Sequence, residues 1–266
     1  MLKGLYIAGT NDYTIPADAM NILNSKMLDV CEIDGLGRPS ADLYTTELVG
    51  ADASVYSGQT VKSRQITLSV KTRNDSERMS LYRLLGYGQK KRLFFENDAG
   101  IYWIDGYVKG ATYAAKPAKL TELEIPIFCP YPWFRSLLAH KVDVPFGTSF
   151  IAQQRGDICA GIGASVEINT AGNMTAFALS DSAGNAITYT SSGRYKLTGA
   201  KGYIQLVNTT PGAHAFFNAK AIQDISVTKS WVTVPPNSEI ATITATFNTN
   251  ETPNGRFIWY DTWSGI

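Results

Sequence analysis

The chain is poor in the residues that most often carry catalysis. Its 266 residues include two histidines, His140 and His214, which lie far apart and have no partner at metal-ligand spacing. Nucleophile-elbow, zincin, phosphate-loop and dinucleotide-binding motifs are missing. The carboxylates of the second half are scattered, whereas a glycosidase needs a pair beside one cleft. Although a Ser-His-Asp site can assemble from distant residues, we expect no enzyme and predict no catalytic, cofactor-binding or metal-binding residue.

Cysteine is also scarce. Cys31, Cys129 and Cys159 are an odd number at wide spacing, and none belongs to a Cys-x-x-Cys motif. Disulfides are rare in reducing compartments, where a free cysteine behaves as a small apolar side chain. We therefore expect all three cysteines to be buried and unpaired.

Charge and long apolar runs are limited too. Charged residues make up 18% of the chain, and the formal net charge of +1 gives no overall attraction to nucleic acid or to an anionic membrane. No apolar run reaches the roughly 20 residues that span a bilayer, and the first residues lack the apolar core of a signal peptide. We expect a protein that is made and assembled in a cytoplasm, with no membrane insertion.

The sequence does contain clear local patterns in its first half. Residues 64–72 alternate apolar and polar side chains and predict a strand. A helix is predicted directly afterwards over 77–85, because Asn74 can cap it, Glu77 occupies the capping-box position, and Gly86 matches the preferred C-terminal residue. Further strands are predicted at 92–96 and 101–105, which the turn 97–100 joins in a hairpin, and at 107–113 and 120–128.

Two segments of the first half are irregular. Residues 40–60 are polar and weakly patterned, and they predict an extended arm or a loop between strands. Pro130 and Pro132 lack the N–H that a strand donates, so the strand before them must stop near Pro130. The aromatic residues around Pro132 make this stiff exit a candidate domain boundary.

The second half changes character near residue 156. Short strand-like runs are separated by turns roughly every 8–12 residues, a pattern typical of sandwiches and barrels. The turn clusters lie at 170–173, 181–185, 191–193, 199–202, 210–212 and 235–238. We therefore predict three parts: a first domain over 1–134, a linker over 135–155, and a β-sandwich over 156–266.

Several segments, spread over most of the chain, carry a resemblance to a known family. They are Ile33-Asp34-Gly35-Leu36 followed by Pro39, the strand that begins Arg64-Gln65-Ile66, the capped helix to Leu85, the run Ile127-Phe128-Cys129-Pro130-Tyr131-Pro132, Gly156-Asp157 with Gly161, Ser230-Trp231 ahead of Pro236-Asn237, and the ending Arg256 to Ile266. In this order and spacing they resemble the distal tail proteins of long-tailed, non-contractile, siphovirus-type phages.

The resemblance implies a fold and a role. The fold is mainly β, with an N-terminal β domain that carries one α-helix and an extended arm, and a C-terminal galectin-like β-sandwich. The role is that of a structural protein of the virion tail tip or baseplate, in which N-terminal domains form a homohexameric ring. The implied partners are the tail-tube protein, a tail-associated hub or fibre protein and, in some relatives, a receptor-binding protein. No cofactor is implied.

Two groups of residues are candidates for binding. The aromatics Trp231, Trp259, Tyr260 and Trp263 can stack on sugar rings or anchor a core or an interface. The basic residues Arg73, Arg78, Arg83, Lys90 and Lys91 either cover solvated faces or, in a ring, set the charge of the lumen or of subunit contacts. The alternative to a ring protein is a carbohydrate-binding or adhesin module that acts in host attachment and recognises cell-surface carbohydrate.

Overall fold

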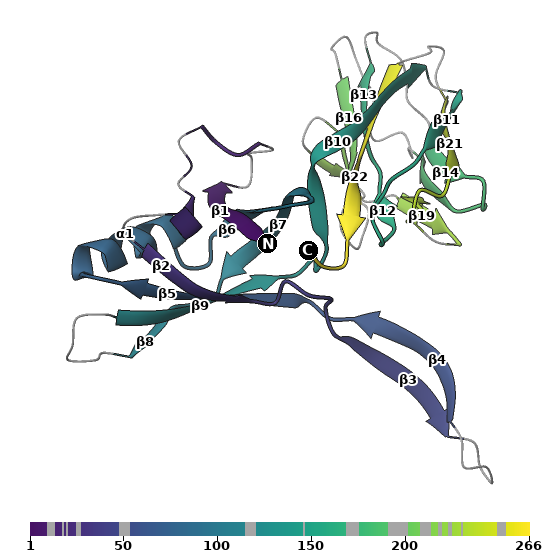
Figure 1. The fold of residues 1–266 in the computed structure, drawn as a ribbon. Helices are drawn as coiled ribbons and strands as arrows, with labels where there is room; N and C mark the ends of the chain where they lie inside the picture. The colour runs from purple at the N-terminus through teal and green to yellow at the C-terminus, as the bar shows by residue number, and fades with distance from the viewer. Residues whose placement is uncertain are drawn as a thin grey trace. The chain divides into compact units, whose positions relative to one another are not determined.

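The computed structural model describes residues 1–9, 14–17, 19, 21–24, 28–47, 54–114, 121–145, 147–168, 176–190, 202–207, 214–217, 220–222, 225–229, 231–248 and 254–266. Over these residues the chain is mainly β with one α-helix, which confirms the predicted fold class (Figure 1). The chain divides into two compact units. The first contains Met1–Leu137 with Trp263–Ile266, and the second contains Leu138–Thr262.

The first unit consists of strands around one helix. Its elements are β1 (Leu2–Gly9), the 3-10 turn η1 (Ile22–Asn24), β2 (Leu28–Asp34), β3 (Ala41–Glu47), β4 (Ser54–Val61), β5 (Arg64–Thr72), α1 (Asp75–Leu85), β6 (Lys90–Asn97), β7 (Gly100–Val108), β8 (Thr112–Ala114), β9 (Thr121–Cys129) and the start of β10 (Phe134–Pro145). The predicted strand 64–72 and the predicted hairpin around residues 97–100 are confirmed. The predicted strand 107–113 is wrong, since β7 ends at Val108 and β8 begins at Thr112.

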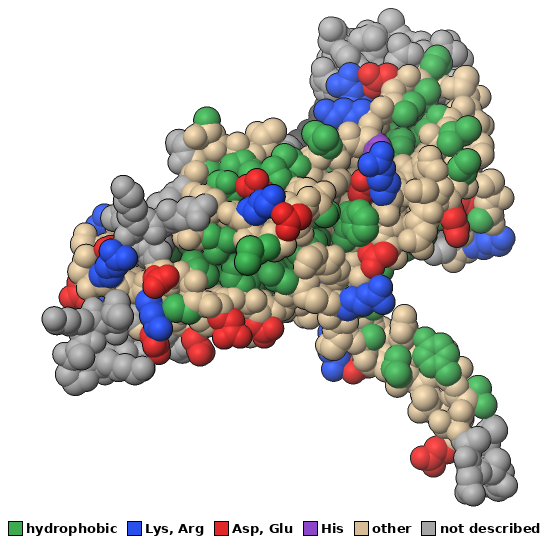
Figure 2. Space-filling view, in the orientation of Figure 1, with side chains coloured by type: hydrophobic (Ala, Val, Ile, Leu, Met, Phe, Trp, Pro, Cys, Tyr) green, Lys and Arg blue, Asp and Glu red, His purple; other side chains and the backbone are tan. Residues whose placement is uncertain are grey.

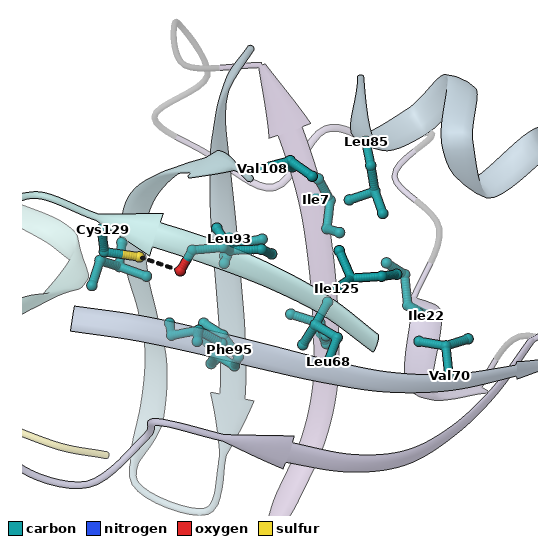
Figure 3. Packing of buried hydrophobic residues seen from close by; sticks show 14 of the residues in the cluster. Ile7, Ile22, Leu68, Val70, Leu85, Leu93, Phe95, Val108, Ile125 and Cys129 are labelled. Carbon is teal, nitrogen blue, oxygen red and sulfur yellow. Dashed lines mark hydrogen bonds between the residues drawn. The ribbon is translucent and has the colours of Figure 1, made fainter. Parts of the chain in front are cut away.

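One apolar core holds the first unit together. Strand β6 lies between β1 and β7, while β5 lies between β2 and β9, and all these pairings are antiparallel. The strands send alternate side chains to the same core, including Ile7, Leu68, Phe95 and Ile125, and α1 adds Leu85 (Figure 3). Burial of these side chains is the main source of stability for the unit.

The helix α1 begins and ends as its residues predict. Asn74 accepts a hydrogen bond from the N–H of Glu77 at 2.9 Å, and the Glu77 carboxylate accepts one from the N–H of Arg73 at 2.7 Å. Two amide groups that the helix itself cannot pair are thus satisfied. Gly86 ends the helix with a positive φ of 41°.

After β9 the chain forms strands where the sequence predicts a linker. Strand β9 ends at Cys129, as the prolines require, but β10 begins at Phe134 and β11 (Ser149–Ala152) follows. Residues 135–155, expected to form a linker, therefore contain two strands. The division between the units falls within β10, at Leu137 and Leu138, and the residues after Thr262 belong to the first unit.

The second unit has two main sheets. Its remaining elements are β12 (Ala160–Gly161), β13 (Gly163–Ile168), β14 (Ala176–Asp181), β15 (Ala186–Thr190), β16 (Gly202–Val207), β17 (His214–Phe217), β18 (Lys220–Ile222), β19 (Ile225–Thr228), β20 (Thr233–Val234), β21 (Ala241–Asn248) and β22 (Asn254–Trp263). One sheet has the order β11-β21-β14-β15-β19, and the other contains β18-β17-β16-β13-β22-β10. The predicted turn clusters at 170–173, 191–193 and 210–212 lie outside the described residues.

The core of the second unit lies between these sheets. Ile243 from the first sheet and Phe257 from the second belong to one buried cluster, and the Phe150 and Phe257 rings approach to 4.6 Å. Apolar residues from both sheets meeting in one layer define a β-sandwich.

At the 181–185 turn, Asp181 accepts hydrogen bonds from the backbone N–H groups of Ala183 and Asn185.

The expectation for the cysteines is wrong for two of the three. Cys129 is buried, whereas Cys31 and Cys159 are exposed, and all three are free thiols. Cys31 lies at a shift in the β2–β5 register between Val30 and Glu32, where regular alternation breaks down. Burial raises the pKa of Cys129 to about 12, although the charge of Arg64 opposes this, so the Cys129 thiol is protonated at neutral pH.

Among the described residues, no helix has the length and apolar character needed to cross a bilayer.

Candidate assembly surface

An arm projects from the sheet of the first unit. Strands β3 and β4 pair with each other in a two-stranded antiparallel sheet (Figure 1), which confirms the extended arm predicted for residues 40–60. A two-stranded ribbon alone in water is marginally stable, since it buries little apolar surface. Every residue of β3 is exposed.

Both faces of the arm carry large apolar side chains. Leu43 and Tyr56 are 63% and 57% exposed, and the strand register places them on one face. Tyr44 and Val55 are 52% and 50% exposed, and they lie on the other face. Figure 2 shows hydrophobic side chains along this ribbon. Concentrated exposed apolar surface is typical of an interaction site, so the arm has the character of a docking element.

One guanidinium lies at the root of the arm, which we define as the segments 35–40 before β3 and 62–64 after β4. Arg64, three residues after β4 ends, is only 4% exposed. Its Nε donates to the Pro132 carbonyl at 2.7 Å, its Nη1 donates to the carbonyls of Gly35 and Gly37, and its Nη2 donates to the carbonyl of Ser264. All four acceptors are backbone oxygens, so a single side chain joins three separate segments of the first unit.

The chemistry of this root requires an arginine. Burial lowers the pKa of Arg64 to about 10, so the group remains charged at neutral pH. The guanidinium also lies 4.5 Å from the centre of the Phe134 ring, which favours a buried cation. A planar fork of five donors can reach several acceptors at once, whereas a lysine ammonium acts as a point charge.

Two glycines fit closely around the same root. Gly35 has a φ of +86°, and a Cβ there would lie 2.1 Å from the carbonyl oxygen of Gln65. A Cβ on Gly265 would meet the Leu36 carbonyl oxygen at 3.1 Å, and the N–H of Ile266 donates to that same oxygen at 3.1 Å. The segment that leads into the arm is therefore in direct backbone contact with residues 265–266.

The predicted basic residues are distributed over α1 and β6. Arg73 and Arg83 are exposed beside and within α1, and Lys91 is half-buried on β6. Arg78 pairs with Asp75 at 2.9 Å, and Lys90 pairs with Asp105 at 3.2 Å. Their predicted role at a ring lumen or subunit contact stays a prediction.

The predicted aromatic side chains are more buried than stacking on a sugar ring requires. Trp259 is buried, stacks on His140 with ring centres 5.5 Å apart, and donates its N–H to the Gln153 carbonyl. Trp231 is half-buried and packs against the core of the second unit.

The other two aromatic candidates are also partly covered. Tyr260 is half-buried on β22. Trp263 packs against the core of the first unit, and its ring meets that of Tyr102 edge-on with centres 6.1 Å apart. A sugar ring needs an open aromatic face, and none of the four is fully exposed.

Sequence reasoning missed one polar pair. His140 Nε2 lies 2.8 Å from Asp261 Oδ1, and the same oxygen accepts the N–H of Arg155 at 2.9 Å. These residues are 121 positions apart, so no local spacing reveals them. The pair ties β10 to β22 within the second unit. Within the described ranges no cluster of three or more His, Cys, Asp or Glu side chains is arranged to hold a metal ion.

Comparison by sequence finds no matching family model and no matching curated protein. By structure, the chain is similar to the SPP1 Dit (gp 19.1) protein, described as a paradigm of the hub adsorption apparatus in phages that infect Gram-positive bacteria. That similarity has a TM-score of 0.57 at 13% identity, over 97% of this chain and 98% of the other.

The chain is also similar to chains of the phage P2 baseplate in its activated conformation. The calcium-bound form gives a TM-score of 0.55 at 11% identity over 100% of both chains, and the strontium-bound form gives 0.52 at 11% over 99% of both. At these identities the likeness establishes a shared fold. The resemblance indicated by the sequence is confirmed at that level.

Proposed function

We propose that this chain is a structural protein of a siphovirus-type phage tail. It forms a hexameric ring that joins the distal end of the tail tube to the baseplate or tail tip, and it anchors host-recognition components there. Its partners are other copies of itself, the tail-tube protein, and a hub or fibre protein. The observation that carries the proposal is an exposed, apolar arm on a chain that shares its whole fold with baseplate and hub proteins.

The arm supplies the kind of contact that a ring needs. A ring is built from a heterologous interface, in which one surface of a subunit meets a different surface of the next. An arm that reaches beyond its own unit can make such a contact, because its two faces are not covered by the chain that carries it. Docking of the arm on the next copy would bury Leu43, Tyr44, Val55 and Tyr56.

The carbohydrate-binding alternative has weaker support. It relies on aromatic faces in the second unit, yet Trp259 is buried under His140 and Trp231 packs against the core. We therefore assign the chain a mechanical role rather than a catalytic or sugar-binding one.

Light scattering across protein concentration tests the proposal. We expect the mass to rise from that of one chain, 29.0 kDa, toward that of six chains. Tyr56→Ser should hold the protein at one chain, whereas Tyr87→Ser, which removes a similarly exposed tyrosine outside the arm, should assemble normally. A wild-type protein that stays monomeric at every concentration contradicts the ring. A Tyr56→Ser protein that assembles like wild type contradicts the role of the arm.

A further inference from the structure

The path of the chain places Arg64 where the arm returns to the sheet, beside the segment that leads into the arm. The chain enters the arm after Gly35 and Gly37, runs out along β3, returns along β4 and reaches Arg64. Because the Arg64 guanidinium donates to the Gly35 and Gly37 carbonyls, the returning strand binds the outgoing segment directly. The N–H of Lys62 also donates to the Ser40 carbonyl at 2.9 Å, which is a second hydrogen bond between the returning and the outgoing segments.

The same guanidinium binds two segments that do not belong to the arm. The Pro132 carbonyl lies in the turn after β9, and the Ser264 carbonyl lies in the segment that follows β22. Both segments are anchored independently, since β9 pairs with β5 along its full length and Trp263 packs against the first core. Arg64 therefore connects the arm root to fixed points of the first unit.

We propose that Arg64 is the positioning residue of the arm: its guanidinium holds the outgoing segment, the Pro132 turn and residues 264–266 together, and so fixes the direction in which the arm leaves the sheet. This inference builds on the proposed role of the arm as the docking element. A partner then meets an arm that is already oriented, which reduces the entropy lost on docking.

The surroundings of the root agree with a positioning role. An open cleft of about 450 Å³ lies beside the root and is lined by residues 33–40 and 63–65. The segment 35–39 therefore borders open space, and the hydrogen bonds from Arg64 to the Gly35 and Gly37 carbonyls restrain it. Hydrogen bonds from a charged donor are stronger than those between neutral groups, so loss of the contacts to Gly35 and Gly37 should release this segment measurably.

Hydrogen–deuterium exchange of the full chain tests the inference, with Arg64→Met as the main variant. Exchange at the Ile266 N–H, which donates to the Leu36 carbonyl, and at the Lys62 N–H, which donates to the Ser40 carbonyl, should rise about tenfold or more, since each 1.4 kcal/mol of lost protection is a factor of ten. Exchange at 66–70 in β5 should stay within about twofold of wild type, because the apolar core is intact. Arg64→Lys should give an intermediate increase, because it keeps the charge and loses the fork. Arg83→Met, an exposed arginine of α1, is the matched control and should change neither region.

A second variant tests the root without touching Arg64. Gly265→Ala places a Cβ 3.1 Å from the Leu36 oxygen, whereas Gly37→Ala places one where nothing lies within 4 Å. We expect Gly265→Ala to raise exchange at the Ile266 N–H and Gly37→Ala to leave it unchanged. This pair remains informative if Arg64→Met fails to fold.

The outcomes test the positioning role of Arg64 independently of the proposal that the protein forms a ring. Raised exchange confined to the Ile266 and Lys62 N–H groups supports the positioning role even if the wild-type protein never forms a hexamer. Unchanged exchange at the Ile266 and Lys62 N–H groups in Arg64→Met overturns it, because Arg64 would then not restrain the root. An equal rise throughout β5 and β9 also overturns it, because Arg64 would then stabilise the core in general. Where the wild-type protein does assemble, Arg64→Met should need at least tenfold more protein to reach the same mass.

Discussion

At the scale of single residues, Asp105 links stability to pH. Arg92 donates to both carboxylate oxygens, at 2.7 and 3.1 Å, and Lys90 lies 3.2 Å away. Burial alone would raise the pKa of Asp105, but the hydrogen bonds and charge of Arg92, with Lys90 and Arg135 nearby, outweigh burial and hold the pKa below its usual 3.8. The folded state therefore binds this proton more weakly than the unfolded state does.

The consequence is a loss of stability in acid. The contribution of Asp105 is fully present above about pH 4 and disappears as the pH falls through the lowered pKa of the folded state. We predict that Asp105→Asn lowers the free energy of unfolding by about 1–3 kcal/mol at pH 7 and by less at pH 3, measured by urea titration. Asp75→Asn, which breaks an exposed pair with Arg78, should cost at most about 0.5 kcal/mol. Equal losses at both pH values would contradict the linkage.

At the scale of elements, the cap of α1 is a local signal with a measurable cost. Asn74→Ala removes the side chain that accepts from the Glu77 N–H, and we predict a loss of about 1 kcal/mol in the free energy of unfolding. Ser80→Ala, on the exposed face of the same helix, should change stability little. Denaturant titration measures both, and indistinguishable values for the two variants would show that the cap adds nothing.

Elements of this kind are the ones that the sequence predicts well. The strand 64–72, the helix α1 and the hairpin of β6 and β7 each depend on residues a few positions apart, so local pattern identifies them. The segment 135–155, which the sequence predicts to be a linker, contains most of strand β10. Its partners β7 and β22 are distant in the sequence, and no local rule names them.

The role of Arg64 shows the same limit within one strand. Arg64 shares the buried face of β5 with Ile66, Leu68 and Val70, so alternation alone indicates that its side chain points inward. Its acceptors lie between 27 and 200 residues away, at Gly37 and Ser264 among others. The sequence can therefore flag a buried arginine, while the identity of its partners depends on the tertiary fold.

At the scale of the whole molecule, the division into two units has a consequence for unfolding. Each unit has its own buried cluster, with Ile66 fully buried in the first and Ile243 fully buried in the second. The chain passes between the units twice, at Leu137–Leu138 and at Thr262–Trp263. Separate cores connected in this way predict two cooperative blocks, each of which can open without the other.

Two core substitutions test this separation. Ile66→Ala and Ile243→Ala should each destabilise their own unit by about 2–5 kcal/mol, because each leaves a cavity in a close-packed core. Hydrogen–deuterium exchange should then rise across the first unit for Ile66→Ala and across the second unit for Ile243→Ala. If either substitution raised exchange equally in both units, the molecule would be a single cooperative block. Separate responses would mean that a cavity in the core of the second unit leaves the arm root intact, because the two cores then carry their stability independently.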